Sequence, residues 1–596
     1  MKKTLLVAAT LALIAVLPSG CMTIPSTGLA QTSTVRGLFL ASTGPRSEYA
    51  KSFWWELGEA EIVAYLDRLQ KAGLNELYPA VYGHGNYFFK TTHAAFPKGV
   101  AQDRLEIDPL AVLIREAHRR EMKVIPFFPF LVAGGAPYVK QSAGGTLPHP
   151  EWFSLNTRGE RGTTLSFDAA NPEVREYLNH LVEDLLLYDI DGLMLDYIRY
   201  LGTHMGYTPL ARKVFKGKTG VDPQDLYEHP EAFSTNIVYC LNPNSWAGKD
   251  WNLSSMLALM NRINMPFKLV PEKADIFAQV PANGTVLIAS YYDISEDVIG
   301  KLDAFVKGGG NVIFLDAPTT AMKTRSATLG PVLGMKSGLL WTTVQERKLE
   351  VKTAHPITAG VKGGMLTSSA NALTEIVPGT AKILATFASG RPAVVLNTRG
   401  KGRCLLFNFQ MLIKYDGQVG DELLANAAKW FLSSRGDEPG SKKLAELNAA
   451  WTQYRCDQVT AVVKMVRETM KKRKPKVLLG AATTPKEAHV NTVFQEWKTW
   501  LKRGYMDVAY PMDYVASVKE LRDVLAWQAE GIPKSQIIPL LTIYTRAGGK
   551  VVPVTPERIN AQLDFVRDQG FAGAGLFSNQ RLSAELEAAL AARKKR

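Results

Sequence analysis

Two neighbouring stretches decide the fold of this chain: Phe167–Tyr177 (FDAANPEVREY) and Tyr188–Tyr200 (YDIDGLMLDYIRY). The first predicts a helix that begins at Pro172, because proline suits a first helical turn and Asn171 can cap it. The second predicts a buried strand over 192–195, with a polar cluster directly after it: Asp196, Tyr197, Arg199 and Tyr200. A (β/α)8 barrel places its chemistry where a buried parallel strand meets its loop.

Similar strand signals recur on both sides of these stretches, each followed by a helical pattern. They lie at 35–39, 74–79 and 123–126 before the quoted region, and at 476–481, 508–511, 537–542 and 574–577 near the C-terminus. Together with the strand at 192–195 they make eight strands that alternate with helices. This pattern predicts an α/β fold, a (β/α)8 TIM barrel interrupted after its fourth strand.

The barrel segments resemble the glycosyl hydrolase-like family 10, a group of bacterial barrels. The likeness rests on the end of the fourth strand and on motifs in both segments, among them Val35–Phe39, Leu74–Pro79, His149–Phe153, Arg455–Val459, Gln495–Trp497 and Pro511–Tyr514. The commoner form of the family has two adjacent aspartates where this chain has Asp196 and Tyr197. The resemblance implies a hydrolase of glycan chains, since members include outer-membrane lipoproteins that act on peptide-free peptidoglycan strands.

Residues 237–437 carry a strand and helix rhythm of their own, so we expect barrel segments at 31–236 and 438–596 with an inserted domain between them. The expected elements are a helix at 254–263, strands at 276–277, 285–289 and 311–315, a helix at 295–307, strands at 392–396 and 400–407, and a helix at 422–432. The pattern predicts an open parallel sheet and resembles a class I glutamine amidotransferase-like domain. No cysteine lies at a sharp strand-to-helix turn, so we expect a non-catalytic insert that forms an oligomer or shapes the cleft.

The first 21 residues are typical of a bacterial lipoprotein signal. Lys2 and Lys3 precede an apolar run over 5–17, and the segment ends on small residues and Cys21. This similarity to a lipobox implies cleavage before Cys21, a lipid on its sulfur and contact with a membrane; plain secretion and a retained anchor are the alternatives. Met22 fits outer-membrane sorting if the cell is Gram-negative.

Composition and charge restrict the partners. The chain has 596 residues and a formal charge of +14, which becomes +12 when Lys2 and Lys3 leave with the signal. A basic excess spread this thinly favours anionic envelope polymers or lipid head groups over a nucleic-acid groove, and a merely solvated surface is the alternative. We expect no metal or cofactor, and we expect buried free thiols at Cys240, Cys404 and Cys456.

Glycoside hydrolysis requires two carboxyl groups beside the scissile bond. Asp196 is the best candidate for nucleophile or base, and Arg199 could hold it ionised, clamp an acidic sugar, or form a purely structural ion pair with it. Asp513 and Glu496 are the candidates for the acid, with a turn residue and a helix cap as the respective alternatives. We expect Asp191 and Asp507 to stabilise the opposite face, and Asp168 to orient the helix that begins at Pro172.

Sugar rings pack well on aromatic side chains, so aromatic residues at strand ends are candidate substrate contacts. The candidates are Tyr82, Tyr197, Tyr200, Trp497, Tyr514 and Tyr544, with His84 as a polar contact. The sequence therefore predicts an envelope lipoprotein that hydrolyses O-glycosidic bonds in a polysaccharide, with peptidoglycan strands as the first substrate to test. The alternative is a carbohydrate-binding scaffold on a glycosidase-like barrel; a third interpretation makes the insert the active part.

Overall fold

The computed structural model describes residues 34–41, 52–96, 107–234, 237–241, 257–259, 263, 265–270, 276–289, 295–315, 327–335, 341–343, 348–366, 371–373, 379–409, 419–432, 439–547 and 550–594. The helices and strands within these ranges belong to one compact unit, Val35–Arg596. The signal segment and Cys21 lie outside the described residues. Within the described part, no helix has the length and the apolar character needed to span a bilayer.

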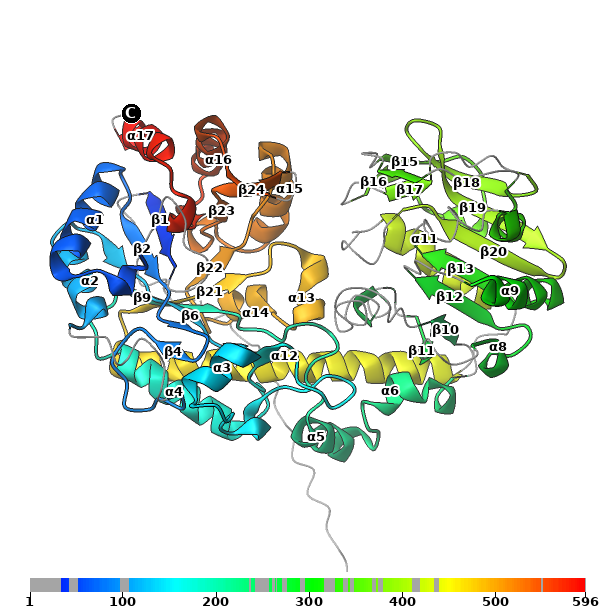
Figure 1. Cartoon of the computed structure of the whole chain (residues 1–596), viewed down its shortest axis with the longest axis horizontal. Coiled ribbons are helices and arrows are strands. Elements are labelled where there is room, and N and C mark those ends of the chain that lie inside the picture. The colour runs from blue at the N-terminus through cyan, green and yellow to red at the C-terminus, as the bar shows by residue number, and fades with distance from the viewer. Residues whose placement is uncertain are drawn as a thin grey trace, which may run out of the picture. The chain divides into compact units, whose positions relative to one another are not determined.

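Eight parallel strand positions form a closed barrel (Figure 1). They are β1 (Val35–Leu40), β2 (Glu76–Pro79), β5 (Lys123–Val124) continued by β6 (Phe127–Pro129), β9 (Gly192–Asp196), β21 (Leu478–Thr483), β22 (Val508–Pro511), β23 (Leu540–Thr542) and β26 (Gly573–Phe577). Hydrogen bonds join them in the orders β23-β26-β1-β2-β5 and β22-β21-β9-β6. Parallel bridges from Ala80 to Phe127 and from Ala509 to Ile537 close the two gaps. The predicted barrel is confirmed.

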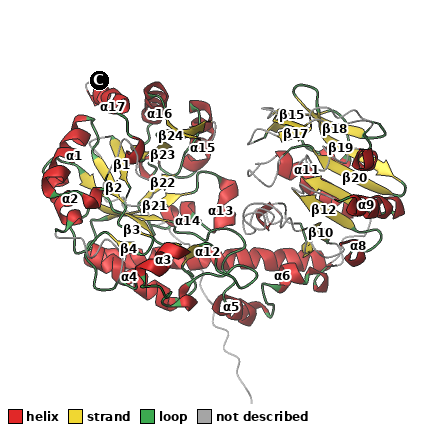
Figure 2. Cartoon of the chain, viewed as in Figure 1, coloured by secondary structure: helices red, strands yellow, loops and turns green. Residues whose placement is uncertain are grey.

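The two barrel segments contain the following helices, most of which surround these strands (Figure 2). They are α1 (Glu59–Lys71), α2 (Pro109–His118), α3 (Ala136–Ser142), α4 (Pro172–Leu185), α5 (Pro209–Thr219), α6 (Asp225–Glu228), α12 (Pro439–Arg473), α13 (Glu487–Val493), α14 (Trp497–Lys502), α15 (Val518–Ala529), α16 (Pro556–Asp568) and α17 (Ala584–Lys594). As predicted, α4 begins at Pro172, and the backbone N–H of Glu173 donates to the Asn171 side chain over 2.9 Å. α13 and α14 are separate helices, because Phe494 takes a left-handed conformation, φ 62°, and ends α13.

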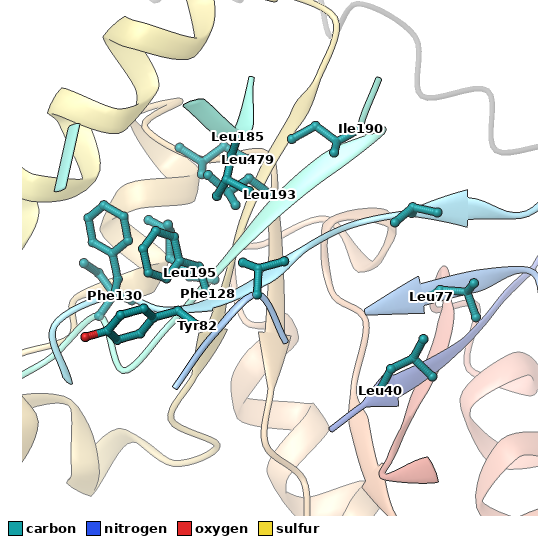
Figure 3. Packing of buried hydrophobic residues seen from close by; sticks show 14 of the residues in the cluster. Leu40, Leu77, Tyr82, Phe128, Phe130, Leu185, Ile190, Leu193, Leu195 and Leu479 are labelled. Carbon is teal, nitrogen blue, oxygen red and sulfur yellow. The ribbon is translucent and has the colours of Figure 1, made fainter. Parts of the chain in front are cut away.

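Side chains alternate between the two faces of the barrel wall. Leu193 and Leu479 point outward and pack with Leu185 of α4, and Leu195 lies beside Phe128, all in the large core between strands and helices (Figure 3). The intervening residues line the barrel interior, which we call the lumen, where a second apolar cluster includes Phe39, Tyr78, Ile125, Met194 and Tyr510. Successive residues of a strand face opposite sides, so Asp196, two residues after Met194, faces the lumen as Met194 does.

Short hairpins lie in the loops: β3 (Tyr82–Gly83) with β4 (Asn86–Tyr87), β7 (Val132–Gly135) with β8 (Thr164–Ser166), and β24 (Tyr544–Ala547) with β25 (Lys550–Pro553). The last of these follows β23 directly, so it belongs to the face of the barrel that holds the carboxyl ends of the strands. Another two-stranded sheet pairs β14 (Trp341–Thr343) with β17 (Asn371–Leu373).

A separate sheet spans the insert, with nine strands in the order β11-β10-β12-β13-β20-β19-β18-β15-β16. These are β11 (Phe267–Val270), β10 (Val238–Leu241), β12 (Thr285–Ala289), β13 (Asn311–Leu315), β20 (Gly402–Phe407), β19 (Pro392–Arg399), β18 (Lys382–Phe387), β15 (Lys348–Val351) and β16 (Gly364–Met365), with helices α8 (Ile276–Gln279), α9 (Glu296–Gly308) and α11 (Val419–Leu432). The first five strands are parallel, as predicted. The other four are antiparallel, because a tight turn at Gly400 joins β19 to β20.

Two further expectations for the insert can be checked. The strand expected at 276–277 is wrong, since these residues open α8. Only residues 257–259 and 263 of the helix expected at 254–263 are described, and the first three are helical. The three cysteines are buried free thiols, as predicted; Cys240 and Cys404 lie within β10 and β20, and burial raises their thiol pKa values.

Candidate active site

Asp196 brings a carboxyl group into the lumen at the carboxyl end of β9. Asp196 is only 5% exposed, and its backbone carbonyl accepts a hydrogen bond from the N–H of Phe130 over 2.7 Å. Burial raises the carboxyl pKa from 3.8 to about 6, while the charge of Arg199 acts in the opposite direction. A carboxyl group with this pKa can hold or release a proton near neutral pH, as acid–base catalysis requires.

Tyr197 turns the chain sharply after Asp196. Its φ of 46° is in the left-handed region, which a bulky residue seldom adopts, and the N–H of Arg199 donates to its carbonyl over 2.8 Å. The Arg199 guanidinium lies over the Tyr197 ring, 5.0 Å from its centroid. Among the described residues, Arg199 makes no ion pair with a carboxylate, so the structural ion pair with Asp196 considered above is not formed.

Four aromatic rings gather at the same end of the barrel. The ring centroid of Phe577, at the end of β26, lies 5.4 Å from that of Tyr514, 6.3 Å from that of Tyr544 and 5.3 Å from that of Phe39. The pKa of the Tyr514 phenol is raised, first by loss of solvation and then by the nearby charge of Asp196. Tyr514 nevertheless exposes 42% of its surface. Asp196, Tyr197, Arg199, Tyr514 and Tyr544 therefore form one neighbourhood, as expected from their positions at strand ends.

Phe577 was not among the sequence candidates, although a signal for it exists. It is the last apolar residue of β26 and lies two residues after Gly575, on the same face of the strand. That face points into the barrel, since a Cβ added at Gly575 would contact Tyr78 there. Counting alternate residues back from the strand end would have placed Phe577 in the lumen.

Asp513 does not join this neighbourhood. In β22, Val508 and Tyr510 face the lumen, Met512 continues that series, and Asp513 faces the helices. Its Oδ1 accepts a hydrogen bond from the Gln528 side chain of α15 over 2.7 Å, and burial raises its carboxyl pKa well above the ordinary value. The geometry thus places Asp513 under α15 rather than beside a substrate in the lumen.

Glu496 lies on the helical layer. It occupies the N-cap position of α14 without a capping side-chain bond, and its Oε2 accepts from Gln453 of α12 over 3.3 Å. The preceding residue, Gln495, is fully buried and connects two strand ends: it accepts from the N–H of Thr484 and donates to the carbonyls of Ala482 and Ile198. The motif that contains Glu496 therefore positions the loops after β21 and β9, and Glu496 itself faces outward.

Several other candidate contacts lie in the core. Tyr82, Tyr200 and Trp497 are each at most 2% exposed, so the expectation that they contact substrate is corrected: neighbouring side chains cover them. The hydroxyl of Tyr82 donates to the carbonyl of Ala133, and that of Tyr200 donates to Asp168. His84 is part-buried; its Nδ1 accepts from the N–H of Gly135, and its ring lies 5.0 Å from that of Tyr138.

The remaining aspartates have structural contacts, as predicted. Asp507 forms a bidentate ion pair with Arg467, both contacts being 2.7 Å, and Asp191 accepts from the N–H of Val124 and from His118. Asp168 is buried and accepts from the N–H of Ala170, directly before α4, as its expected role at that helix requires. It also accepts from the hydroxyls of Thr208 and Tyr200, so it fixes the entrance of α5 and the loop after β9 as well. Within the described ranges, no group of three or more His, Cys, Asp or Glu side chains is arranged to hold a metal ion.

Comparisons with known proteins found chains that are similar to this one. The chain shares 24% identity over 143 residues with glycosyl hydrolase YngK of Bacillus subtilis (strain 168), covering 23% of this chain and 27% of that protein. Similar solved structures include α-L-fucosidase isoenzyme 2 from Paenibacillus thiaminolyticus, at 11% identity and a TM-score of 0.27 over 68% of this chain and 84% of that one. Another is the exo-β-1,4-mannosidase Op5Man5 from Opitutaceae bacterium strain TAV5, at 12% identity and a TM-score of 0.27 over 67% and 96% of the two chains.

The family comparison covers most of the chain. The model of glycosyl hydrolase-like family 10 matches residues 34–299 and 420–560. These ranges include the loop that follows Asp196 and every barrel strand except β26. The first matched range also extends beyond residue 237 into the insert. The chain therefore belongs to the glycosyl hydrolase-like 10 family.

Proposed function

We propose that this protein hydrolyses O-glycosidic bonds of a polysaccharide at the mouth of its barrel. The observation that carries the proposal is the buried carboxyl group of Asp196, which faces the lumen with a pKa of about 6. Tyr197, Tyr514 and Tyr544 provide aromatic surface around it, on which a sugar ring can lie. Asp196 then acts as nucleophile or as the base that activates water.

The second carboxyl group of such a reaction is not assigned by the geometry. Asp513 and Glu496 stay candidates on sequence grounds, but one contacts Gln528 and the other contacts Gln453 on the outer side of the strands. This observation favours a second candidate function, in which the barrel binds a glycan without cleaving it. The two functions share the binding surface and differ in whether Asp196 takes part in bond cleavage.

The substrate and the location are proposed together. A lipid on Cys21 would hold the protein at the cell envelope, in the outer membrane if the cell is Gram-negative, where peptidoglycan glycan strands are the first substrate to test. The net charge of +14, which becomes +12 without Lys2 and Lys3, supports an anionic polymer as the partner. A role of the insert in forming a homo-oligomer belongs to the same proposal.

One experiment separates hydrolysis from binding. The purified mature protein and Asp196→Asn are incubated with peptide-free peptidoglycan strands and with a panel of envelope polysaccharides, and soluble products are analysed by mass spectrometry. Fragments released by the wild type alone support a glycosidase and identify the bond. Binding by both proteins without fragments would instead support the glycan-binding scaffold.

A further inference from the structure

We infer that Arg199 is an anion-recognition residue which selects glycans that carry a carboxylate on the sugar next to Asp196. This inference rests on the proposed function, since it assumes that a sugar occupies the mouth of the barrel. It adds the chemical class of that sugar. The evidence lies in how Arg199 is held and in what surrounds it.

The guanidinium is fixed in place without being neutralised. Tyr197 supports it through a cation–π contact of 5.0 Å, and the left-handed backbone at Tyr197 holds both side chains on the same turn. Within the described part of the chain, Arg199 donates no side-chain hydrogen bond and forms no ion pair. Two other part-buried arginines, on α4 and α12, do have such partners: Arg175 donates to Gln458 and to the carbonyl of Ala169, and Arg467 donates to Asp507. The five N–H donors of Arg199 are thus available to a ligand.

Arg199 is also close enough to the reactive carboxyl group for a ligand to contact both. Arg199 follows Asp196 by three residues on the turn that Tyr197 forms, where its backbone N–H donates to the Tyr197 carbonyl and its guanidinium lies over the Tyr197 ring. In agreement with this geometry, its charge acts on Asp196, Tyr197 and Tyr514. A guanidinium group can donate two parallel hydrogen bonds to a carboxylate. Because Arg199 already stacks on Tyr197, it loses less side-chain conformational entropy when a ligand binds. A sugar with its ring on Tyr514 and a carboxylate at Arg199 would present a glycosidic oxygen near Asp196.

Arg68 offers a matched control. Its guanidinium lies 5.1 Å from the centroid of the Tyr65 ring, almost the geometry of Arg199 on Tyr197, but Arg68 lies on α1 and pairs with Glu587. Replacing either arginine by glutamine removes one positive charge and one cation–π contact. Only the change at Arg199 alters the surroundings of Asp196.

The test compares each acidic glycan with its own methyl ester. Two probes are used: peptide-free peptidoglycan strands, which carry lactyl carboxylates, and an oligomeric uronate, which carries ring carboxylates. Dissociation constants are measured in the Asp196→Asn background, so that no bond is cleaved, for the parent and for R199Q, R199K and R68Q. We expect the parent to bind one free acid about ten-fold or more tightly than its ester, and the probe that does so identifies the kind of carboxylate.

Expected and contrary outcomes are distinct. R199Q should bind the acid and its ester with about equal affinity. The preference for the acid should remain in part in R199K and stay unchanged in R68Q. Equal binding of acid and ester by the parent, or an undiminished preference in R199Q, would overturn the inference. Failure of the inference does not imply failure of the proposed function: a wild-type protein that cleaves the esters as well as the acids is a hydrolase without carboxylate selection, and one that binds acids through Arg199 but cleaves nothing is a selective binding protein.

Discussion

The carboxyl groups of Asp196 and Asp513 lie on opposite faces of the barrel wall. Asp196 is the last residue of β9 and faces the lumen, whereas Asp513 follows β22 and accepts a hydrogen bond from Gln528 of α15. The two strands are separated only by β21. Asp196 occupies a strand position that faces the lumen, whereas Asp513 occupies one that faces the helices. The carboxyl group of Asp196 can therefore reach substrate, and that of Asp513 is enclosed by α15.

This separation predicts that Asp513→Asn keeps turnover within about three-fold of the wild type, whereas Asp196→Asn loses about 100-fold or more, the usual size of an acid–base contribution. Burial raises the carboxyl pKa of Asp513 well above its ordinary value and so favours the protonated form, whose shape and hydrogen bond to Gln528 asparagine imitates. Glu496→Gln should behave like Asp513→Asn, because Glu496 contacts Gln453 on the helical layer. Initial rates on the substrate identified above measure all three variants. A 100-fold loss in Asp513→Asn would show that the loop after β22 rearranges when substrate binds.

The raised pKa of Asp196 predicts how stability depends on pH. The folded carboxyl group keeps its proton up to about pH 6, whereas the unfolded one releases it near 3.8. The folded state therefore binds more protons in this interval, and its stability relative to Asp196→Asn falls as the pH rises from about 4 to 6, by at most about 3 kcal/mol, and is constant above about pH 7. Urea unfolding of both proteins at half-unit steps of pH measures the difference. A difference that is independent of pH, or that grows in favour of the wild type on raising the pH, would contradict the burial of this group.

Much of the barrel was predictable because its signals are local. The proline and asparagine that begin α4, the apolar run of β9 and the polar residues after it are each decided within about a dozen residues. The same holds for the structural aspartates Asp191 and Asp507, which precede their strands and bind backbone N–H groups on neighbouring strands.

The aromatic contacts were less predictable because their exposure depends on distant segments. Tyr82 and Tyr514 both follow a barrel strand, yet Tyr82 is covered by Tyr87 and Phe128 while Tyr514 stays half-exposed beside Phe577. The antiparallel half of the inserted sheet was missed for a related reason. Strand direction depends on the turn at Gly400 and on the pairing of β18 with β15, 34 to 38 residues earlier in the chain, which periodicity alone does not reveal.

Tyr514→Ala should raise KM about ten-fold and change kcat much less, because the ring offers a stacking surface beside Asp196 without taking part in proton transfer. Tyr505→Ala is a suitable control: Tyr505 is also part-exposed and lies under the Lys464 ammonium, but it precedes β22 at the opposite end of the barrel. Steady-state kinetics on a soluble oligosaccharide gives both constants. An equal fall in kcat and kcat/KM would instead assign the Tyr514 hydroxyl to the chemical step.

Cys21→Ala should move the protein from the membrane fraction to the soluble fraction, because the residue is expected to carry the lipid. Met22→Asp is the companion variant: it keeps the lipid and, in a Gram-negative cell, should shift the protein from the outer to the inner membrane. Cell fractionation followed by immunoblotting measures both. Membrane association of Cys21→Ala at the wild-type level would mean that another feature of the chain holds it there.

Arg455→Met should destabilise the protein by about 3 kcal/mol or more, although Arg455 contacts no carboxylate among the described residues. Its buried guanidinium donates to the carbonyls of Thr203 and Met205, in the loop that follows β9, and lies 3.9 Å from the ring centroid of Phe494. Methionine fills the volume but leaves both carbonyls without their donor, whereas lysine keeps the charge and should cost less.

Arg473→Met, on the same helix, is the control, because Arg473 is half-exposed and pairs with Glu183 at the surface, where loss of an ion pair costs at most about 1 kcal/mol. Urea unfolding gives the three free energies. If Arg455→Met were as stable as Arg473→Met, the loop after β9 would not depend on Arg455, and its position would instead depend on the contacts of Asp168 and Gln495.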